Sequence, residues 1–313
     1  MSQSVQMKKK VAVVMATHNG ERFWRPQLES LRDQSHERID IWVSDDGSTD
    51  GTMRLLEEAR STWPKGAFHI LSGPREGFAE NFRSLILNGD IVADAYCFCD
   101  QDDVWDRDKI AKGLEWLETV KPGLPGLFCS RTRTLDQEGH PIGQSPLFAR
   151  PPSFRNAIVQ SIAGANTMVM NHLAWETLRI ASKSTRFVSH DWWAYMIVTG
   201  AGGIVHYSPE PHIGYRQHDR NLVGSNNSIA ARLRRYGFLM RSGFSEWTAR
   251  NLDGLRHNER LLTEDARAVL AELERAHDGG LFTRLSGLAR SGAYRQSRSA
   301  NLGLYLACAL GKL

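Results

Sequence analysis

Three carboxylates stand within four residues in the segment 96–105, which reads YCFCDQDDVW. They belong to Asp100, Asp102 and Asp103, and a short apolar strand pattern leads directly into them. Because like charges repel one another, a fold keeps such a group together mainly where it holds a cation, and carboxylate oxygens suit Mg²⁺ or Mn²⁺. The segment is therefore a candidate metal and phosphate site. The alternative is a solvated acidic turn before a helix that begins near Asp106, since a helix N-terminus also favours acids.

A second acidic loop, residues 45–52, reads DDGSTDGT. Counted from Asp46, its spacing nearly matches an EF-hand calcium loop, with Gly51 in sixth place and Glu57 in twelfth. That motif requires a helix before the loop, whereas residues 39–43 alternate as in a strand. The context favours a loop at a strand end whose paired carboxylates accept hydrogen bonds from a nucleobase imide or a ribose.

The first half of the chain alternates between strand and helix patterns, which predicts the fold class. The expected strands are residues 11–15, 39–44, 67–71 and 95–99, and the expected helices are residues 23–34, 52–60 and 77–88. Strict succession of strand and helix indicates crossover units and a mostly parallel sheet. Ligands bind such sheets beyond the carboxyl ends of the strands, and the polar loops fall at those ends.

Six segments occur in an order and spacing that resemble glycosyltransferase family 2: ATHNGE, DDGSTDGT, GPREGFAENF, CDQDDVW, SHDWW and YRQH. The resemblance covers about residues 10 to 225 and is strongest to the rhamnosyltransferase-like branch that builds bacterial cell-surface polysaccharides. It implies an α/β fold of the GT-A (Rossmann-like) type, with a mostly parallel sheet flanked by helices and a helical C-terminal appendage.

The resemblance also implies a division of labour in the acidic segment. Asp100 matches the acid that contacts the ribose, and Asp102 matches the acid that binds the divalent cation, Mg²⁺ or Mn²⁺. His218 matches a downstream position that completes the metal or diphosphate contacts. The alternative for His218 is a histidine in a polar loop, because histidine has many uses.

Further positions match the family's nucleotide contacts. Those that match contacts to the base and ribose are Thr17, Asn19, Glu21, Asp45 and Asp46, and those that match the region over the nucleotide and sugar are Arg75 and Asn81. The alternatives are a surface charge in a Gly-rich turn for Arg75 and a helix-surface amide for Asn81.

Asp191 is the expected catalytic base. Enzymes of this family invert the anomeric centre, so one carboxylate must take the proton of the attacking acceptor hydroxyl. The alternative is a plain helix N-cap. Family members often carry another acid just before this aspartate, whereas this chain has His190, which could tune the pKa of Asp191. Trp192 and Trp193 are candidates for stacking on sugar rings, although their spacing favours at least one of them as core.

The composition is that of an ordinary globular chain: 313 residues, 41% hydrophobic and 24% charged. We expect a GT-A catalytic domain at 1–226, with a nucleotide-sugar half at about 10–120 and an acceptor half at about 121–226, followed by a helical basic region at 227–313.

The apolar runs are too short to span a bilayer, and the N-terminus lacks the pattern of a signal peptide. The four cysteines show no zinc spacing, so we expect reduced core cysteines.

The C-terminal region differs in charge from the rest. Residues 230–313 contain 14 Lys and Arg against 8 Asp and Glu, and no acid follows Asp278. A basic helix with apolar residues resembles an interfacial membrane helix, so we expect peripheral membrane contact through residues 280–313. The apolar residues are Leu281, Phe282, Leu285, Leu288 and Tyr294. The alternatives are a helical cap on the sheet edge and a dimer interface. No nucleic-acid module is recognised, so no nucleic acid is expected as a partner.

The sequence therefore predicts an inverting, metal-dependent glycosyltransferase. The expected donor is a nucleotide diphosphate sugar, with dTDP-rhamnose favoured, and the expected acceptor is a glycan or lipid-linked glycan. The expected location is cytoplasmic, peripheral on the inner face of the bacterial cytoplasmic membrane. The alternatives are a UDP-sugar donor and a non-catalytic homologue that binds a carbohydrate or nucleotide sugar. Two other enzyme classes are disfavoured by the loop after the first expected strand, which reads ATHNGERF. A nucleotidyltransferase should have a Gly-rich loop with Arg and Lys there. An aspartate phosphatase should have an acidic pair there.

Overall fold

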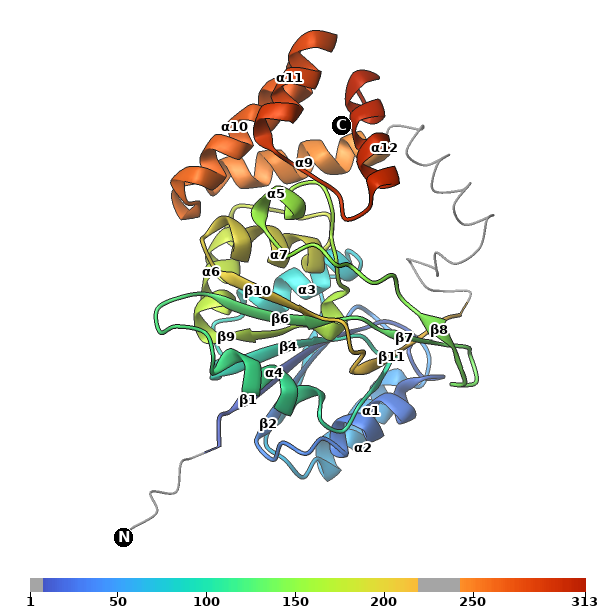
Figure 1. Cartoon of the computed structure of the whole chain (residues 1–313). Helices are drawn as coiled ribbons and strands as arrows, with labels where there is room; N and C mark the ends of the chain where they lie inside the picture. Colours follow the sequence, from blue (N-terminus) through green and yellow to red (C-terminus); the bar gives the residue numbers. More distant parts are fainter. Residues whose placement is uncertain (1–7, 219–242) are drawn as a thin grey trace.

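The central element is a seven-stranded sheet in the order β10-β6-β9-β4-β1-β2-β3 (Figure 1). The structure is a computed structural model that describes residues 8–218 and 243–313. The strands are β1 (Val11–Thr17), β2 (Ile39–Asp45), β3 (Phe68–Ser72), β4 (Ala95–Cys99), β6 (Gly126–Ser130), β9 (Val169–Asn171) and β10 (Ile204–Ser208). Only β9 runs antiparallel to its neighbours in this sheet, as its pairing with β4 and β6 shows. The predicted mostly parallel sheet is confirmed.

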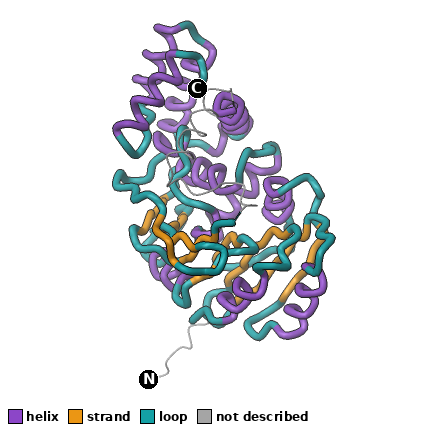
Figure 2. The backbone as a smooth tube through the Cα atoms, turned by 90° about the vertical axis from the view of Figure 1, so that its right-hand side faces the viewer, coloured by secondary structure: helices purple, strands orange, loops and turns teal. Residues whose placement is uncertain are grey.

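Helices cover both faces of this sheet (Figure 2). Strand β1 shows why, because Val11, Val13 and Met15 belong to one buried cluster while Ala12 and Val14 belong to the other. The first cluster contains side chains of α1 (Trp24–Arg32), α2 (Thr52–Thr62) and α4 (Lys109–Leu117). The second contains side chains of α3 (Phe78–Leu87), α5 (Phe154–Ala157), α6 (His172–Lys183) and α7 (His190–Gly200). All four cysteines are free and buried.

A smaller sheet carries a later segment of the chain back to the acidic loop. Its order is β5-β11-β7-β8, from β5 (Val104–Trp105), β7 (Arg133–Leu135), β8 (Pro141–Gln144) and β11 (Ile213–Arg216). Strand β5 follows directly after Asp103 and pairs antiparallel with β11. This pairing brings Arg216 and His218 to the end of β4. A strand of two residues has no pattern of its own, which is why the sequence did not predict β5.

Four helices make up the described C-terminal part: α9 (Gly243–His257), α10 (Glu264–Asp278), α11 (Leu281–Ser291) and α12 (Arg298–Ala309). They lie beyond the layer of α5 and α7 (Figure 1). Arg155 on α5 forms an ion pair with Asp265 on α10 at 2.7 Å. The predicted boundary between 1–226 and 227–313 falls outside the described residues, so that division stays a prediction. None of the described helices has the length and apolar character to cross a membrane.

Candidate functional site

The strand order places four loops side by side at one edge of the sheet. Strands β4, β1, β2 and β3 are neighbours and run parallel, so their carboxyl ends lie together. The loops that follow them are residues 100–103, 18–23, 46–51 and 73–77. Most predicted site residues lie in these loops or at the adjoining strand ends, and the structure therefore brings them together.

The two aspartates at the end of β2 organise their own loop and the next one. Asp45 is 7% exposed, and its carboxylate accepts hydrogen bonds from the Ser48 N–H at 2.8 Å and from the Thr17 hydroxyl at 3.1 Å. Asp46 accepts from the N–H of Arg75 at 2.6 Å and from that of Gly77 at 2.8 Å. These bonds fix the loops that follow β2 and β3. The predicted base and ribose roles of Thr17, Asp45 and Asp46 stay predictions.

The loop after β1 is bonded to the loop after β2 through Asn19 and Glu21. The Asn19 amide oxygen accepts from the Thr49 N–H at 2.8 Å, and the Asn19 N–H donates to the Ser48 hydroxyl at 2.8 Å. Glu21 accepts from the Gly51 N–H at 2.9 Å. Asn19 has a positive φ of 49°. Residues in this region are uncommon and cluster at functional sites when the surroundings enforce them, as here.

Arg75 and Asn81 have contrasting positions. Arg75 is exposed and has a positive φ of 61°, and its side chain packs against Gly47. Asn81 is 1% exposed, and its amide donates to the Ser44 carbonyl at 2.9 Å. It lies in α3 but faces the sheet, so it is not a helix-surface amide. Its role toward the nucleotide and sugar stays a prediction.

The acidic loop after β4 is joined to the segment after β11. His218 Nε2 lies 2.6 Å from Asp102 Oδ2, and the His218 ring stacks on Phe23 with centroids 4.6 Å apart. Arg216 donates from Nε to the Asp102 carbonyl at 3.1 Å and from its N–H to Asp103 at 3.3 Å. Asp103 is fully buried and also accepts from the Asn166 amide. A carboxylate and an imidazole in contact are a suitable donor pair for a divalent cation.

The crowded carboxyls shift one another's ionisation. Burial, followed by the charges of Asp102 and Asp191, raises the pKa of Asp100 to about 7. Burial also raises the pKa of Asp191, which Ser189 and Ser161 partly offset by hydrogen bonding. Asp103 has its pKa raised by burial and then by Asp102 and Asp100. The charge of Asp191 thus acts on Asp100, and the predicted catalytic role of Asp191 stays a prediction.

Helix α7 bears on three sequence-based interpretations: the N-cap alternative for Asp191, the tuning by His190 and the two tryptophans. Ser189 is its N-cap and the helix begins at His190, so Asp191 stands in the first turn and is not the cap. His190 is 5% exposed, stacks on Phe82 with centroids 3.7 Å apart, and has its pKa lowered to about 3 by burial. It is therefore neutral and supplies no charge to tune Asp191. Trp192 is 6% exposed and Trp193 fully buried, so both are core and neither is free to stack on a sugar.

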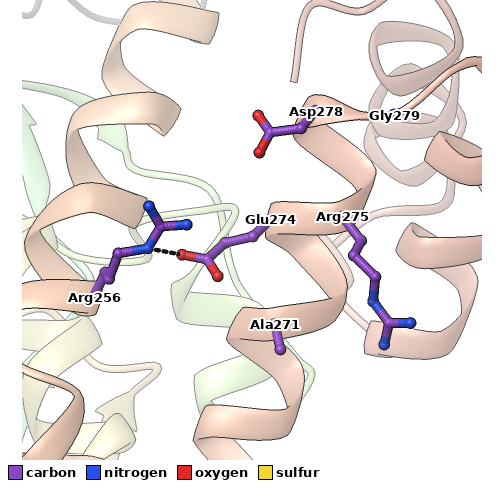
Figure 3. A pocket seen from close by; sticks show the side chains of 6 residues that line it. All are labelled: Arg256, Ala271, Glu274, Arg275, Asp278 and Gly279. Atoms are coloured by element: carbon purple, nitrogen blue, oxygen red, sulfur yellow. Dashed lines mark hydrogen bonds and ion pairs between the residues drawn. The ribbon is translucent and has the colours of Figure 1, made fainter.

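Two other features of the described residues resemble binding sites. Ligand atoms of Asp106, Asp108 and His212 lie within 4.8 Å of one another, but Arg133 already binds both oxygens of Asp106. A surface hollow between α9 and α10 contains the ion pair of Arg256 and Glu274 at 2.9 Å (Figure 3). The hollow is lined by Arg256, Ala271, Glu274, Arg275, Asp278 and Gly279. It includes no residue of the strand-end loops, so it is not the predicted site.

The sequence reasoning missed three residues of this site. Gln101 bonds twice to the backbone of His18, Arg216 bonds to the acidic loop, and Asn166 bonds to Asp103. The YRQH segment contains Arg216 and could have signalled it. Asn166 lies 63 residues from its partner and has no local signal.

Comparison with known proteins gives a consistent result. The family described as glycosyl transferase family 2 matches residues 12–169. The dTDP-rhamnosyl transferase RfbG of Shigella flexneri is 28% identical over 235 residues, which are 72% of this chain and 78% of that protein. A putative teichuronic acid biosynthesis glycosyltransferase, TuaG of Bacillus subtilis (strain 168), is 24% identical over 56% of this chain and 68% of that one.

Solved structures resemble the whole arrangement. S. aureus TarS 1–349 in complex with UDP-GlcNAc has a TM-score of 0.53 and 14% identity, over 90% of this chain and 89% of that chain. GalNAc-T7 with UDP, GalNAc and Mn²⁺ has a TM-score of 0.52 and 10% identity, over 92% of this chain and 56% of that one. At these identities the likeness concerns the fold alone, and the predicted GT-A fold is confirmed.

Metal binding by the free protein should depend on pH. A divalent cation favours ionised carboxylates, and Asp100 holds its proton up to a pKa of about 7. Mn²⁺ should therefore bind more tightly at pH 8 than at pH 6, which calorimetric titration would measure. Asp100→Asn should reduce this difference without removing it, because a histidine ligand must also be neutral to bind the cation, and Asp102→Asn should weaken binding at both pH values. An unchanged pH dependence in Asp100→Asn would contradict the assignment.

Proposed function

We propose that this chain, which belongs to glycosyl transferase family 2, moves rhamnose from dTDP-rhamnose to a hydroxyl group of a lipid-linked glycan or polysaccharide. The transfer inverts the anomeric centre and requires Mg²⁺ or Mn²⁺. The observation that carries the proposal is the gathering of Asp100, Asp102, Asp191 and His218, from three distant parts of the chain, at one edge of the sheet. The rhamnose donor is supported by the name of the Shigella relative, and the surface-glycan acceptor by that of TuaG.

The proposed mechanism assigns one task to each group. Asp102 and His218 would hold the cation, and Asp100 would contact the ribose beside it. When bound, the cation neutralises the charge that develops on the departing nucleoside diphosphate. Asp191 takes the proton of the acceptor hydroxyl as that oxygen attacks the anomeric carbon from the face opposite the diphosphate. Its raised pKa makes Asp191 a stronger base than an exposed aspartate.

Substitution of the base tests this mechanism. Asp191→Asn keeps the size of the side chain but removes its basicity, so kcat should fall by about 10²- to 10⁴-fold while the donor still binds. The measurement is steady-state transfer together with calorimetric binding of dTDP in the presence of Mn²⁺. A loss of donor affinity with little change in kcat would instead give Asp191 a binding role.

A donor panel tests the choice of sugar and base. Thymidine-linked rhamnose, uridine-linked glucose, uridine-linked galactose and uridine-linked N-acetylglucosamine should be compared as donors in one transfer assay. Rhamnose should have the highest kcat/KM, although a pocket that discriminates by shape against extra hydroxyls gives a preference of only about 10- to 200-fold. Equal or better use of a uridine-linked sugar would overturn the rhamnose donor and leave the transferase in place.

The C-terminal helices support a location on the inner face of the cytoplasmic membrane. Helix α11 begins with Leu281 and Phe282, which are 58% and 87% exposed. Helix α12 exposes Leu302 and Leu306, and Leu310 is exposed just after the helix ends at Ala309. The two helices pack against each other, as the hydrogen bond from the Cys308 thiol to the Arg284 carbonyl at 3.3 Å shows. We call these five exposed apolar residues the apolar face.

Charge favours a membrane over a second copy of the chain as the partner of the apolar face. Residues 279–313 contain Arg284, Arg290, Arg295, Arg298 and Lys312 and no acid, and Arg290 is paired with Glu272 of α10 at 3.0 Å. Two copies of such a segment repel each other, whereas each cation close to an anionic bilayer contributes about 1 kcal/mol of binding free energy.

The same helices also cover the catalytic layer. Leu288 and Leu304 are buried in the core, so deletion of residues 280–313 would expose that core.

Point substitutions in the apolar face therefore test the location. The double variant Phe282→Ser and Leu306→Ser should lower binding to phosphatidylglycerol vesicles by about 100-fold or more, because each of the two side chains loses about 1.5–3 kcal/mol of apolar burial. Val92 and Ile142 are 60% and 58% exposed elsewhere on the chain. The control variant Val92→Ser and Ile142→Ser should sediment with vesicles as the wild type does. Equal sedimentation of all three proteins would contradict the membrane contact.

A further inference from the structure

The side chain of Gln101, between Asp100 and Asp102, forms two hydrogen bonds with the backbone of one residue in the loop after β1. The His18 N–H donates to Gln101 Oε1 at 3.0 Å, and Gln101 Nε2 donates to the His18 carbonyl at 3.1 Å. This amide pairs with His18 as a neighbouring strand would. The contact begins just beyond the point where the backbone pairing of β1 with β4 ends, at Met15 and Cys99.

The neighbouring loop leaves room for this contact. A Cβ at Gly20 would lie 2.3 Å from Gln101 Oε1, so the absence of a side chain at Gly20 is what allows the amide to sit there. Beyond Gly20 the bonds continue to the first residue of α2, because the Gly20 N–H donates to the Thr52 hydroxyl at 2.9 Å. Gln101 is thus the side-chain link between the acidic loop and the interlocked loops predicted to hold the nucleoside.

We propose that Gln101 is a positioning residue that couples nucleoside binding to metal binding. A nucleoside seated on the loop after β1 stabilises that loop. Because Gln101 is bonded twice to His18, a more ordered His18 loop also holds the loop that carries Asp102 in one conformation. The proposal rests on the proposed function, since it takes the base and ribose to bind at residues 17–21 and the cation at Asp102 and His218. Linkage requires the effect to be reciprocal, so the cation should also tighten nucleoside binding.

Thymidine is the probe that isolates this coupling. It has no phosphate and cannot contact the cation through a diphosphate, so its effect on Mn²⁺ affinity must pass largely through the protein. Mn²⁺ should be titrated calorimetrically with and without saturating thymidine, and uridine should serve as a second probe. In the wild type the nucleoside should tighten Mn²⁺ binding within the usual range for coupled sites, about 5- to 150-fold.

Two different substitutions break the same contact. Gln101→Leu removes both hydrogen bonds at similar size, and Gly20→Ala displaces the amide while leaving Gln101 in place. Each should abolish most of the coupling, and the double variant should lose no more than either single one. A Cβ at Gly89 would meet no atom within 4 Å, so Gly89→Ala is the matched control and should keep the wild-type factor.

The outcomes separate the coupling from the function. If Gln101→Leu fails to fold, Gly20→Ala decides. Full coupling in a folded Gly20→Ala or Gln101→Leu protein would overturn the proposal, as would a wild type that binds dTDP with Mn²⁺ yet shows no effect of thymidine or uridine on Mn²⁺ affinity. Failure of the wild type to bind dTDP or UDP with Mn²⁺ would instead overturn the proposed function itself.

Discussion

The crowding of negative charge at the carboxyl end of β4 is the constraint on which the rest of the site depends. Asp100, Asp102 and Asp103 stand within four residues, and burial together with the charges of neighbouring acids raises the pKa of Asp100 and of Asp103. The fold offsets part of this cost with Arg216, which bonds to the acidic loop. A divalent cation would offset more of it, which is why we propose a metal site here.

The small second sheet connects the acidic loop to the segment that carries His218. Strand β5 begins one residue after the acidic cluster and pairs with β11, and β11 leads to His218. The pairing of two short strands therefore sets the 2.6 Å contact between His218 and Asp102. On the other side, Gln101 and the loops after β1 and β2 bond to one another. The acidic loop is therefore bonded to neighbouring segments of the chain on both sides.

The sequence predicted the parts of this arrangement that depend on local pattern. The strand that ends at Cys99 and the acids after it were found from alternation and charge alone, because a buried parallel strand and a crowded acidic loop have strong local signals. The contact of Asn166 with Asp103 has no such signal, since it depends on how β9 enters the sheet. His190 shows a second limit: its burial, which keeps it neutral, is a property of the packed layer and not of its neighbours in the chain.

The proposed mechanism depends on a divalent cation bound between Asp102 and His218. Anomalous diffraction from crystals of the protein grown with Mn²⁺ and dTDP tests this directly, because Mn²⁺ has a distinct anomalous signal. One strong anomalous peak is expected in contact with the Asp102 carboxylate and the His218 imidazole, beside the diphosphate. A peak at Asp106, Asp108 and His212 instead, or dTDP bound in the site with no peak at Asp102, would contradict it.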